Sequence, residues 1–247
     1  MDKFDLPLIS VVTVVRNGIA GIEKTIKSVI DQDWPAVEYI IIDGLSLDGT
    51  VEVVERYRHK VDVFVSEKDE GIYDAMNKAI NCSSGQYLIY MNCGDVFISN
   101  TSISSVAKYL KKGIEQVIFS GWMRQAEDRI LSRCYPNLSK GYYNHQAIIY
   151  SKSIHSWVGC YVQVNRLTTA DYLFFATVLR SKRVESQVLD VSTALIDING
   201  VSAGSHTMAQ KYAIDYLYGN VSKQKLIFIF IFHGAYRFIK KILRLKS

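Results

Sequence analysis

The chain has 247 residues, of which 49% are hydrophobic and 21% charged, so general disorder is excluded and one domain with a sizeable core is expected. Its four cysteines lack the C-x-x-C spacing of zinc sites and thioredoxin-like pairs. The opening residues MDKFDLPLIS do not resemble a secretory signal, so we expect reduced cysteines and a cytoplasmic location.

The net charge of +5 is distributed unevenly. Residues 223–247 carry seven Lys or Arg and no Asp or Glu, which leaves a net charge of −2 on the first 222 residues. This asymmetry predicts that the tail alone meets an anionic surface. Because the positive charge is confined to an apolar tail and does not spread over a face, nucleic-acid binding is not expected.

Short β-branched runs alternate with helical patterns over the first 97 residues. Strands are expected at 8–15, 37–42, 61–65 and 87–91, with helices between them at 22–34, 51–57 and 72–80. This alternation predicts βαβ units and a parallel sheet. Weaker patterns later in the chain indicate a helix at 103–110, a strand at 116–119 and a helix at 172–179.

Polar residues follow each of the four early strands. They are Arg16-Asn17, residues 43–50, residues 67–74 and residues 92–95. In parallel sheets, ligands bind at the carboxyl ends of the strands, so four polar loops at that edge predict one common site.

Each loop also has an ordinary structural explanation. Asp43 could accept hydrogen bonds from a base or a ribose, whereas Ser46 and Asp48 could simply shape the turn and cap the next helix. Gly71 stands at a helix entrance that favours an anion, with Asp69 beside it, but an ordinary capped helix would look the same.

The stretch YLIYMNCGDVF ends a buried strand with a single carboxylate, Asp95. Magnesium or manganese bound together with substrate phosphates needs only one or two protein carboxylates. Asp95 could therefore suffice for a metal, although an isolated Gly-Asp pair is more typical of a turn.

Four segments occur in order and at ordinary spacing over residues 7–97: LISVVTVVRN, VEYIIIDGLSLDGT, SEKDEGIYDAMNKAI and SGQYLIYMNCGDVF. Together they resemble the family 2 glycosyltransferases, inverting enzymes of the GT-A fold, and within them the subgroup that builds bacterial capsule, O-antigen or exopolysaccharide units. The resemblance implies a Rossmann-like α/β fold with a mixed, mostly parallel sheet flanked by helices. It also implies a nucleotide-diphosphate-sugar donor, most often UDP-linked, a saccharide acceptor and a divalent metal, Mn²⁺ or Mg²⁺.

The resemblance assigns roles to individual positions. It places Thr13, Arg16 and Asn17 at the nucleotide, Asp43 at the base with Ser46 in the same loop, and Asp69, Gly71, Tyr73 and Asn77 at the nucleoside site. Asn92, Gly94 and Asp95 would occupy the metal region, with Asp95 and Asn92 as ligands. The chain departs from the family at Gly44, where a second aspartate is usual, and at Asn92, where the metal motif usually begins with aspartate.

An inverting transfer needs a base that accepts the proton of the acceptor hydroxyl. The family supplies an acidic residue at the start of a downstream helix, which makes Asp171 in TTADYLFF the candidate; a simple helix-terminal charge is the alternative. His145 and Gln146 in YYNHQAIIY would line the donor–acceptor pocket, although a lone histidine before an apolar run is more often structural. Residues 200–205, GVSAGS, would close over the diphosphate.

These assignments divide the chain into a donor half at 1–97, an acceptor and catalytic half at 98–222, and a tail at 223–247. The tail holds seven consecutive apolar residues at 226–232, too few to span a membrane. Beyond them, apolar and basic residues fall on opposite helical faces, which favours a helix lying on anionic lipid over one packed on the body or on a homodimer partner.

A lipid surface suits a polyprenyl-diphosphate-linked acceptor at the cytoplasmic face of the bacterial inner membrane. Two other functions are alternatives to the glycosyltransferase. One is a catalytically silent subunit that binds a nucleotide-sugar or serves as a scaffold. The other is a dinucleotide-dependent oxidoreductase, which is disfavoured because no G-x-G-x-x-G follows the first strand.

Overall fold

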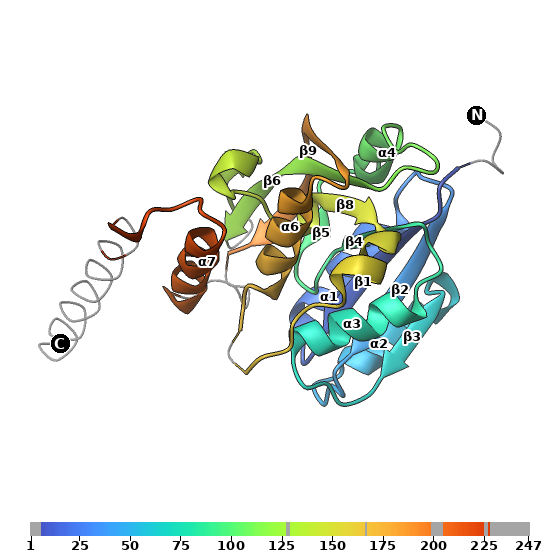
Figure 1. Cartoon of the computed structure of the whole chain (residues 1–247). Coiled ribbons are helices and arrows are strands. Elements are labelled where there is room, and N and C mark those ends of the chain that lie inside the picture. Colours follow the sequence, from blue (N-terminus) through green and yellow to red (C-terminus); the bar gives the residue numbers. More distant parts are fainter. Residues whose placement is uncertain (1–5, 127–128, 166, 199–204, 225–226, 228–247) are drawn as a thin grey trace, which may run out of the picture.

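The computed structural model describes residues 6–126, 129–165, 167–198, 205–224 and 227, and within these its centre is a single mixed sheet (Figure 1). The strands are β1 Ile9–Val15, β2 Val37–Asp43, β3 Val63–Ser66, β4 Tyr87–Tyr90, β5 Val96–Phe97, β6 Gln116–Ala126, β7 Arg129–Cys134, β8 Ile148–Ser151 and β9 Glu185–Asp197. The α-helices are α1 Ile19–Ile30, α2 Thr50–Arg56, α3 Ile72–Cys82, α4 Ser102–Ala107, α5 His155–Val158, α6 Ala170–Ser181 and α7 Ser205–Leu217. Short 3₁₀ turns occupy Arg58–Lys60, Leu138–Lys140, His145–Ala147 and Lys152–Ile154.

The strand order is β3-β2-β1-β4-β8-β6-β9-β5, with β7 paired to β6. The first four strands in this order are parallel, as the βαβ pattern predicts. Strand β8 runs antiparallel to both β4 and β6, so it joins the two halves of the chain in one sheet. The expected α/β fold with a mixed sheet is confirmed.

Helices cover both faces of the sheet. Alternate residues of β1 belong to two cores: Val11 to the core that includes residues of α1, α2 and α4, and Val12 to the core that includes residues of α3 and α6. All seven residues of β1 are therefore buried, which is usual for a strand covered on both sides. This arrangement puts the polar strand ends at one edge, where the helices α3 and α6 also begin.

Several elements differ from the sequence-based expectation. Helix α1 ends at Ile30 and not at Trp34, and the strand expected at 116–119 continues to Ala126 because it pairs with β9 beyond that point. Strand β9 and helix α7 were not predicted at all.

Apart from residues 223, 224 and 227, the tail at 223–247 lies outside the described residues, and so does the amphipathic helix expected there. Within the described part of the chain, no helix combines the length and the apolar character that crossing a membrane requires.

Candidate active site

The loops after β1 and β2 are bound to each other. The Asn17 backbone nitrogen donates to Ser46 Oγ at 2.7 Å, and the Asn17 side-chain oxygen accepts from the Leu47 nitrogen at 2.9 Å. Asn17 adopts a φ of 51°, a left-handed conformation that asparagine tolerates. Asp48 accepts from the nitrogens of Ile19 and Thr50, so the turn-and-cap interpretation holds for this residue.

Asp43 lies beneath these loops and is fully buried. Its carboxylate accepts hydrogen bonds from the Ser46 nitrogen at 3.0 Å and from Ser66 Oγ at 2.7 Å, and also from Ser46 Oγ. In this conformation Asp43 organises the loop, and its contact with a base stays a prediction.

Gly44 explains one departure from the family pattern. A Cβ at this position would lie 2.8 Å from Asp69 Oδ2 and 3.3 Å from Arg16 Cβ. Glycine therefore lets Asp69 approach the loop after β2, and it brings the predicted residues Arg16 and Asp69 to the same place. A second aspartate would not fit here without moving them.

The side chains of two residues that were expected to contact the nucleotide point into the protein interior. Thr13 is fully buried, and its hydroxyl donates to the Met91 carbonyl at 2.8 Å. Asn77 donates to the Tyr161 carbonyl and accepts from the Tyr161 nitrogen, both at 2.9 Å. In this conformation the polar groups of both side chains hold backbone segments together, and their contact with a nucleotide stays a prediction.

Lys78 connects the charged residues around the start of α3. Its ammonium group lies 2.8 Å from Glu67, 2.7 Å from Asp69 and 3.3 Å from Asp74. Gly71 precedes the helix with a φ of 135°, a conformation that side chains rarely adopt. The predicted residues Asp69 and Gly71 thus lie on one ordered turn.

Asp95 is 7% exposed, and both of its carboxylate oxygens are bound. Oδ2 accepts from Gln146 Nε2 at 2.6 Å, and Oδ1 accepts from the Asp197 backbone nitrogen at 3.0 Å. Burial raises the pKa of Asp95 to about 6, although these two hydrogen bonds act in the opposite direction. The backbone N–H of Gly94 donates a hydrogen bond to Thr25 Oγ1 at 3.0 Å, and this bond fixes the turn to α1.

The residues around Asp95 suit a hard divalent cation. The side-chain oxygens of Asn92 and Gln146 are buried without a hydrogen-bond partner among the described residues. Such atoms are costly to leave unsatisfied, and amide and carboxylate oxygens are ligands of Mg²⁺ and Mn²⁺. Within the same part of the chain, no three His, Cys, Asp or Glu residues cluster around a metal position. A cation held through Asn92 and Asp95 would therefore need substrate phosphates or water as further ligands.

Asp171 lies in the first turn of α6 and is held from both sides. Tyr73 donates its hydroxyl to Oδ1 at 2.7 Å, and His145 Nδ1 lies 2.9 Å from Oδ2. Burial by itself would raise the pKa of Asp171, but the charge and hydrogen bond of His145 and the hydrogen bond of Tyr73 lower it below its ordinary value. The carboxylate is thus ionised at neutral pH and able to accept a proton.

The same contacts link Asp171 to Asn92, in the segment where a metal is expected. His145 Nε2 lies 3.0 Å from Asn92 Nδ2. A continuous chain therefore runs from Tyr73 through Asp171 and His145 to Asn92.

Sequence reasoning did not find Lys78, Thr25, Tyr161 and Asp197 as supporting residues. Only Lys78 carried a usable signal, since it follows Asp74 by four residues on one helix. The loop expected to close over the diphosphate lies outside the described residues, except for Ser205 at the start of α7.

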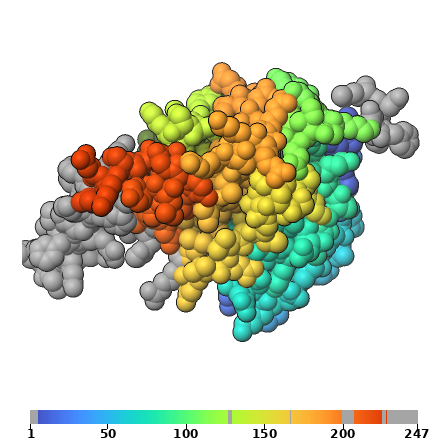
Figure 2. All heavy atoms as spheres, in the orientation of Figure 1, coloured from blue at the N-terminus to red at the C-terminus, as the bar shows by residue number. Residues whose placement is uncertain are grey.

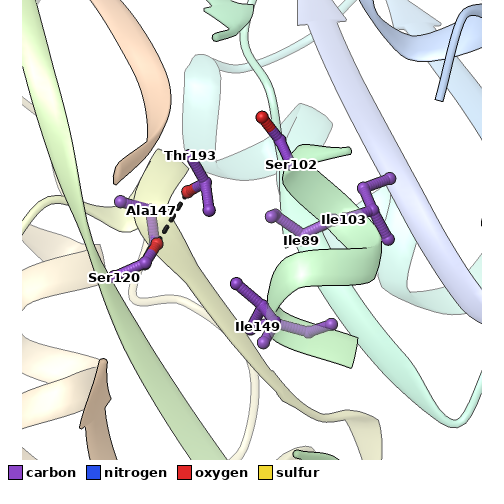
Figure 3. A pocket seen from close by; sticks show the side chains of 8 residues that line it. Ile89, Ser102, Ile103, Ser120, Ala147, Ile149 and Thr193 are labelled. Atoms are coloured by element: carbon purple, nitrogen blue, oxygen red, sulfur yellow. Dashed lines mark hydrogen bonds between the residues drawn. The ribbon is translucent and has the colours of Figure 1, made fainter. Parts of the chain in front are cut away.

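A small, mostly apolar void lies elsewhere in the core, between β4, α4, β6, β8 and β9 (Figure 3). It measures about 10 Å³, and Ser120 and Thr193 hydrogen-bond to each other beside it at 2.6 Å. At that size it is a packing defect and not a ligand site.

The chain resembles glycosyltransferases in sequence. It is 30% identical over 125 residues to the putative teichuronic acid biosynthesis glycosyltransferase TuaG of Bacillus subtilis (strain 168), a match covering 49% of each chain. It is 24% identical over 165 residues to a PGL/p-HBAD biosynthesis glycosyltransferase of Mycobacterium tuberculosis (strain ATCC 25177 / H37Ra), covering 63% of each. The chain spans about half the length of the first of these relatives.

Solved structures share the fold. TarS 1–349 of S. aureus in complex with UDP-GlcNAc superposes with a TM-score of 0.68 at 15% identity, over 85% of this chain and 65% of that one. The mannosyltransferase PcManGT of Pyrobaculum calidifontis, in complex with GDP-Man and Mn²⁺, gives 0.69 at 16% identity, over 88% and 65%. The GT-A fold expected from the sequence is confirmed.

The sequence model described as "Glycosyl transferase family 2" matches residues 10–171, which is more than half of the chain and ends at Asp171. This match includes all four polar strand ends and both residues that bind Asp171. The chain belongs to glycosyl transferase family 2.

Proposed function

We propose that this glycosyltransferase moves a sugar from a nucleotide-diphosphate-sugar, a UDP-sugar in the first instance, to a saccharide acceptor with inversion at the anomeric carbon. The observation that carries the proposal is the Asp171 carboxylate, ionised and fixed by Tyr73 and His145 at the site edge. The relatives' names support a place in bacterial surface-polysaccharide assembly, and the structural neighbours hold nucleotide-sugars.

The transfer is a single displacement. Asp171 accepts the proton of the acceptor hydroxyl while that oxygen forms a bond to the anomeric carbon, and the bond from this carbon to the diphosphate oxygen breaks. Gln146 and the Asp197 nitrogen hold Asp95 in place, and His145 keeps Asp171 oriented. A divalent metal held by Asn92 and Asp95 would stabilise the negative charge of the departing diphosphate.

A panel of UDP- and GDP-sugars tests this function, with binding and diphosphate release measured in Mn²⁺ and in EDTA. Sugar transfer to an added acceptor, or slow donor hydrolysis without one, is the expected result. Donor binding without any turnover under all conditions would favour the silent subunit.

The acceptor is proposed to be lipid-linked, as a polyprenyl-diphosphate saccharide, with the protein peripheral at the cytoplasmic face of the inner membrane. The support is the basic, apolar sequence of 223–247. A chain lacking these residues should move from the membrane to the soluble fraction, whereas unchanged sedimentation with membranes would contradict the idea.

A further inference from the structure

Several large apolar side chains are exposed on β7 and on the segment that follows it. Ile130 is 59% exposed, Leu131 50%, Tyr135 42% and Tyr142 45%. A single exposed apolar residue is ordinary, but a group of them marks surfaces that contact membranes or other proteins. The exposed side chains of residues 129–142 are called here the β7 surface.

A β-bulge accounts for the exposure of two successive apolar residues. In the pairing of β7 with β6, Arg124 lies opposite Ser132 and Gln125 lies opposite Ile130, so Leu131 is the extra residue. A bulge interrupts the alternation of side chains along a strand and re-aims one of them. Here both Ile130 and Leu131 are at least half exposed.

The β7 surface is also basic. Arg129, Arg133 and Lys140 are exposed. The acidic residues at 127 and 128 precede them and lie outside the described residues. When these are counted too, residues 122–144 hold four basic and two acidic residues, a net charge of +2. The first 222 residues together have a net charge of −2, so this surface is positive on a mildly acidic body.

We propose that the β7 surface docks on an anionic lipid bilayer. Ile130 and Leu131 enter the outer part of the acyl-chain region, and Arg129 and Arg133 face the headgroup phosphates. Apolar side chains next to basic ones are the combination that binds anionic lipid, and tyrosines such as Tyr135 are frequent at the membrane–water interface. This inference rests on the proposed membrane location and deepens it, because it gives the folded domain a lipid contact of its own.

The β7 surface lies at the end of the molecule from which the tail leaves. A Cβ at Gly141 would lie 3.2 Å from Lys211 Nζ, which places the segment after β7 against α7. Figure 2 shows the yellow-green residues of this segment beside the red helix α7. Helix α7 ends at the exposed Leu217, shortly before the basic tail begins at Lys223. A membrane that the tail contacts would therefore be within reach of the β7 surface.

The same segment continues to the proposed base. Tyr143 stacks on Tyr172 with 5.2 Å between the ring centroids, and His145 follows two positions later with Nδ1 at 2.9 Å from Asp171 Oδ2. A short stretch of chain therefore joins the proposed lipid contact to the carboxylate that would meet a lipid-linked acceptor.

A second copy of the chain suits this surface less well. Strand β7 pairs with β6 along one edge, and no other strand of the described residues pairs with it. A bulge and charged side chains are features that oppose the addition of a further strand at such an edge. Two copies that met through this surface would also bring their arginines together.

The test measures binding of the full-length protein to vesicles of phosphatidylcholine alone and of phosphatidylcholine mixed with phosphatidylglycerol, by co-sedimentation. One variant combines Ile130→Ser with Leu131→Ser, and the other combines Arg129→Gln with Arg133→Gln. Each should weaken binding to the anionic vesicles about tenfold, since each loses two of the side chains that contact lipid.

Matched controls change exposed residues of the same kinds elsewhere. Ile114→Ser lies just before the start of β6, at the opposite end of that strand from β7, and Arg56→Gln with Lys60→Gln lies before β3. Both controls should bind the anionic vesicles like the wild type.

A tryptophan at the bulge reports the contact directly. Leu131→Trp should show a blue shift of its emission and quenching by brominated lipids when anionic vesicles are added, beyond the change seen with the three tryptophans of the wild type. Ile114→Trp should show neither effect.

Unchanged vesicle binding by both variants, with no shift in Leu131→Trp, would overturn the inference and leave the tail as the lipid contact. A dimer that becomes a monomer in the Ile130→Ser, Leu131→Ser variant, without a change in lipid binding, would overturn it in favour of an interface between copies. If the wild type does not bind anionic vesicles, the inference and the proposed membrane location both fail, whereas turnover of UDP-sugars with a soluble acceptor would still support the glycosyltransferase.

Discussion

Replacing Asp171 with asparagine removes the proposed base while almost preserving its shape. The carboxylate accepts from two donors, the Tyr73 hydroxyl and His145 Nδ1. Asparagine offers one acceptor oxygen, so its NH₂ group must face one of these donors. Hydrogen bonds to a charged group contribute about 1.5–3 kcal/mol each, and we expect the variant to lose about that much stability.

The effect on catalysis should be larger than the effect on folding. A positioned base contributes about 10²–10⁴-fold, so transfer by Asp171→Asn should fall by that factor while UDP affinity stays within about twofold. Initial rates and UDP calorimetry measure the two quantities on the same sample. Asp190→Asn, at an exposed position of β9, is the matched control and should behave like the wild type.

The acid dependence of stability gives an independent check of the same carboxylate. Because folding lowers the pKa of Asp171, its stabilising effect is present above its ordinary value of 3.8 and is lost as pH falls through the lower folded value. Urea unfolding of Asp171→Asn should therefore be less sensitive to acid than that of the wild type. Undiminished turnover in this variant would refute the role of Asp171.

Three further variants test neighbouring parts of the account. Tyr73→Phe removes a hydrogen bond that stabilises the ionised Asp171, so the acid limb of kcat/KM should move to higher pH; an unchanged limb would contradict the contact. Asn77→Ala should lower the free energy of unfolding by about 1–3 kcal/mol in urea titrations and leave UDP affinity unchanged, because it loses two hydrogen bonds to the Tyr161 backbone. Gly44→Ala should weaken UDP binding measurably by calorimetry, since its Cβ would lie 2.8 Å from Asp69 Oδ2 at the proposed donor site; unaltered affinity would contradict the placement of the donor there.

The fold of the first 97 residues could be predicted because most residues of β1, β2 and β4 are buried and the helices between the strands carry regular apolar stripes. Strand β9 escaped prediction because much of it is half-exposed and its apolar residues do not alternate cleanly. Helix α7 mixes polar and apolar residues around its circumference and gives little periodic signal.

The sequence allowed us to predict which loops come together at the site, but not which atoms within it contact one another. Tyr73 and Asp171 are 98 positions apart, and only the topology brings the starts of α3 and α6 together. Thr13 could have been recognised as buried, since it stands in a strand with apolar residues on both sides. Asn77 could not, because its partner Tyr161 lies 84 positions away in a region without clear pattern.

The stereochemistry of the product tests the central claim most directly. The test uses an α-linked UDP-sugar that the wild-type protein turns over, together with an acceptor found by screening. The product should be β-linked, as read from the NMR coupling constant of its anomeric proton. A single displacement assisted by Asp171 requires this inversion. It also requires that the Asp171→Asn variant loses turnover. An α-linked product would contradict it.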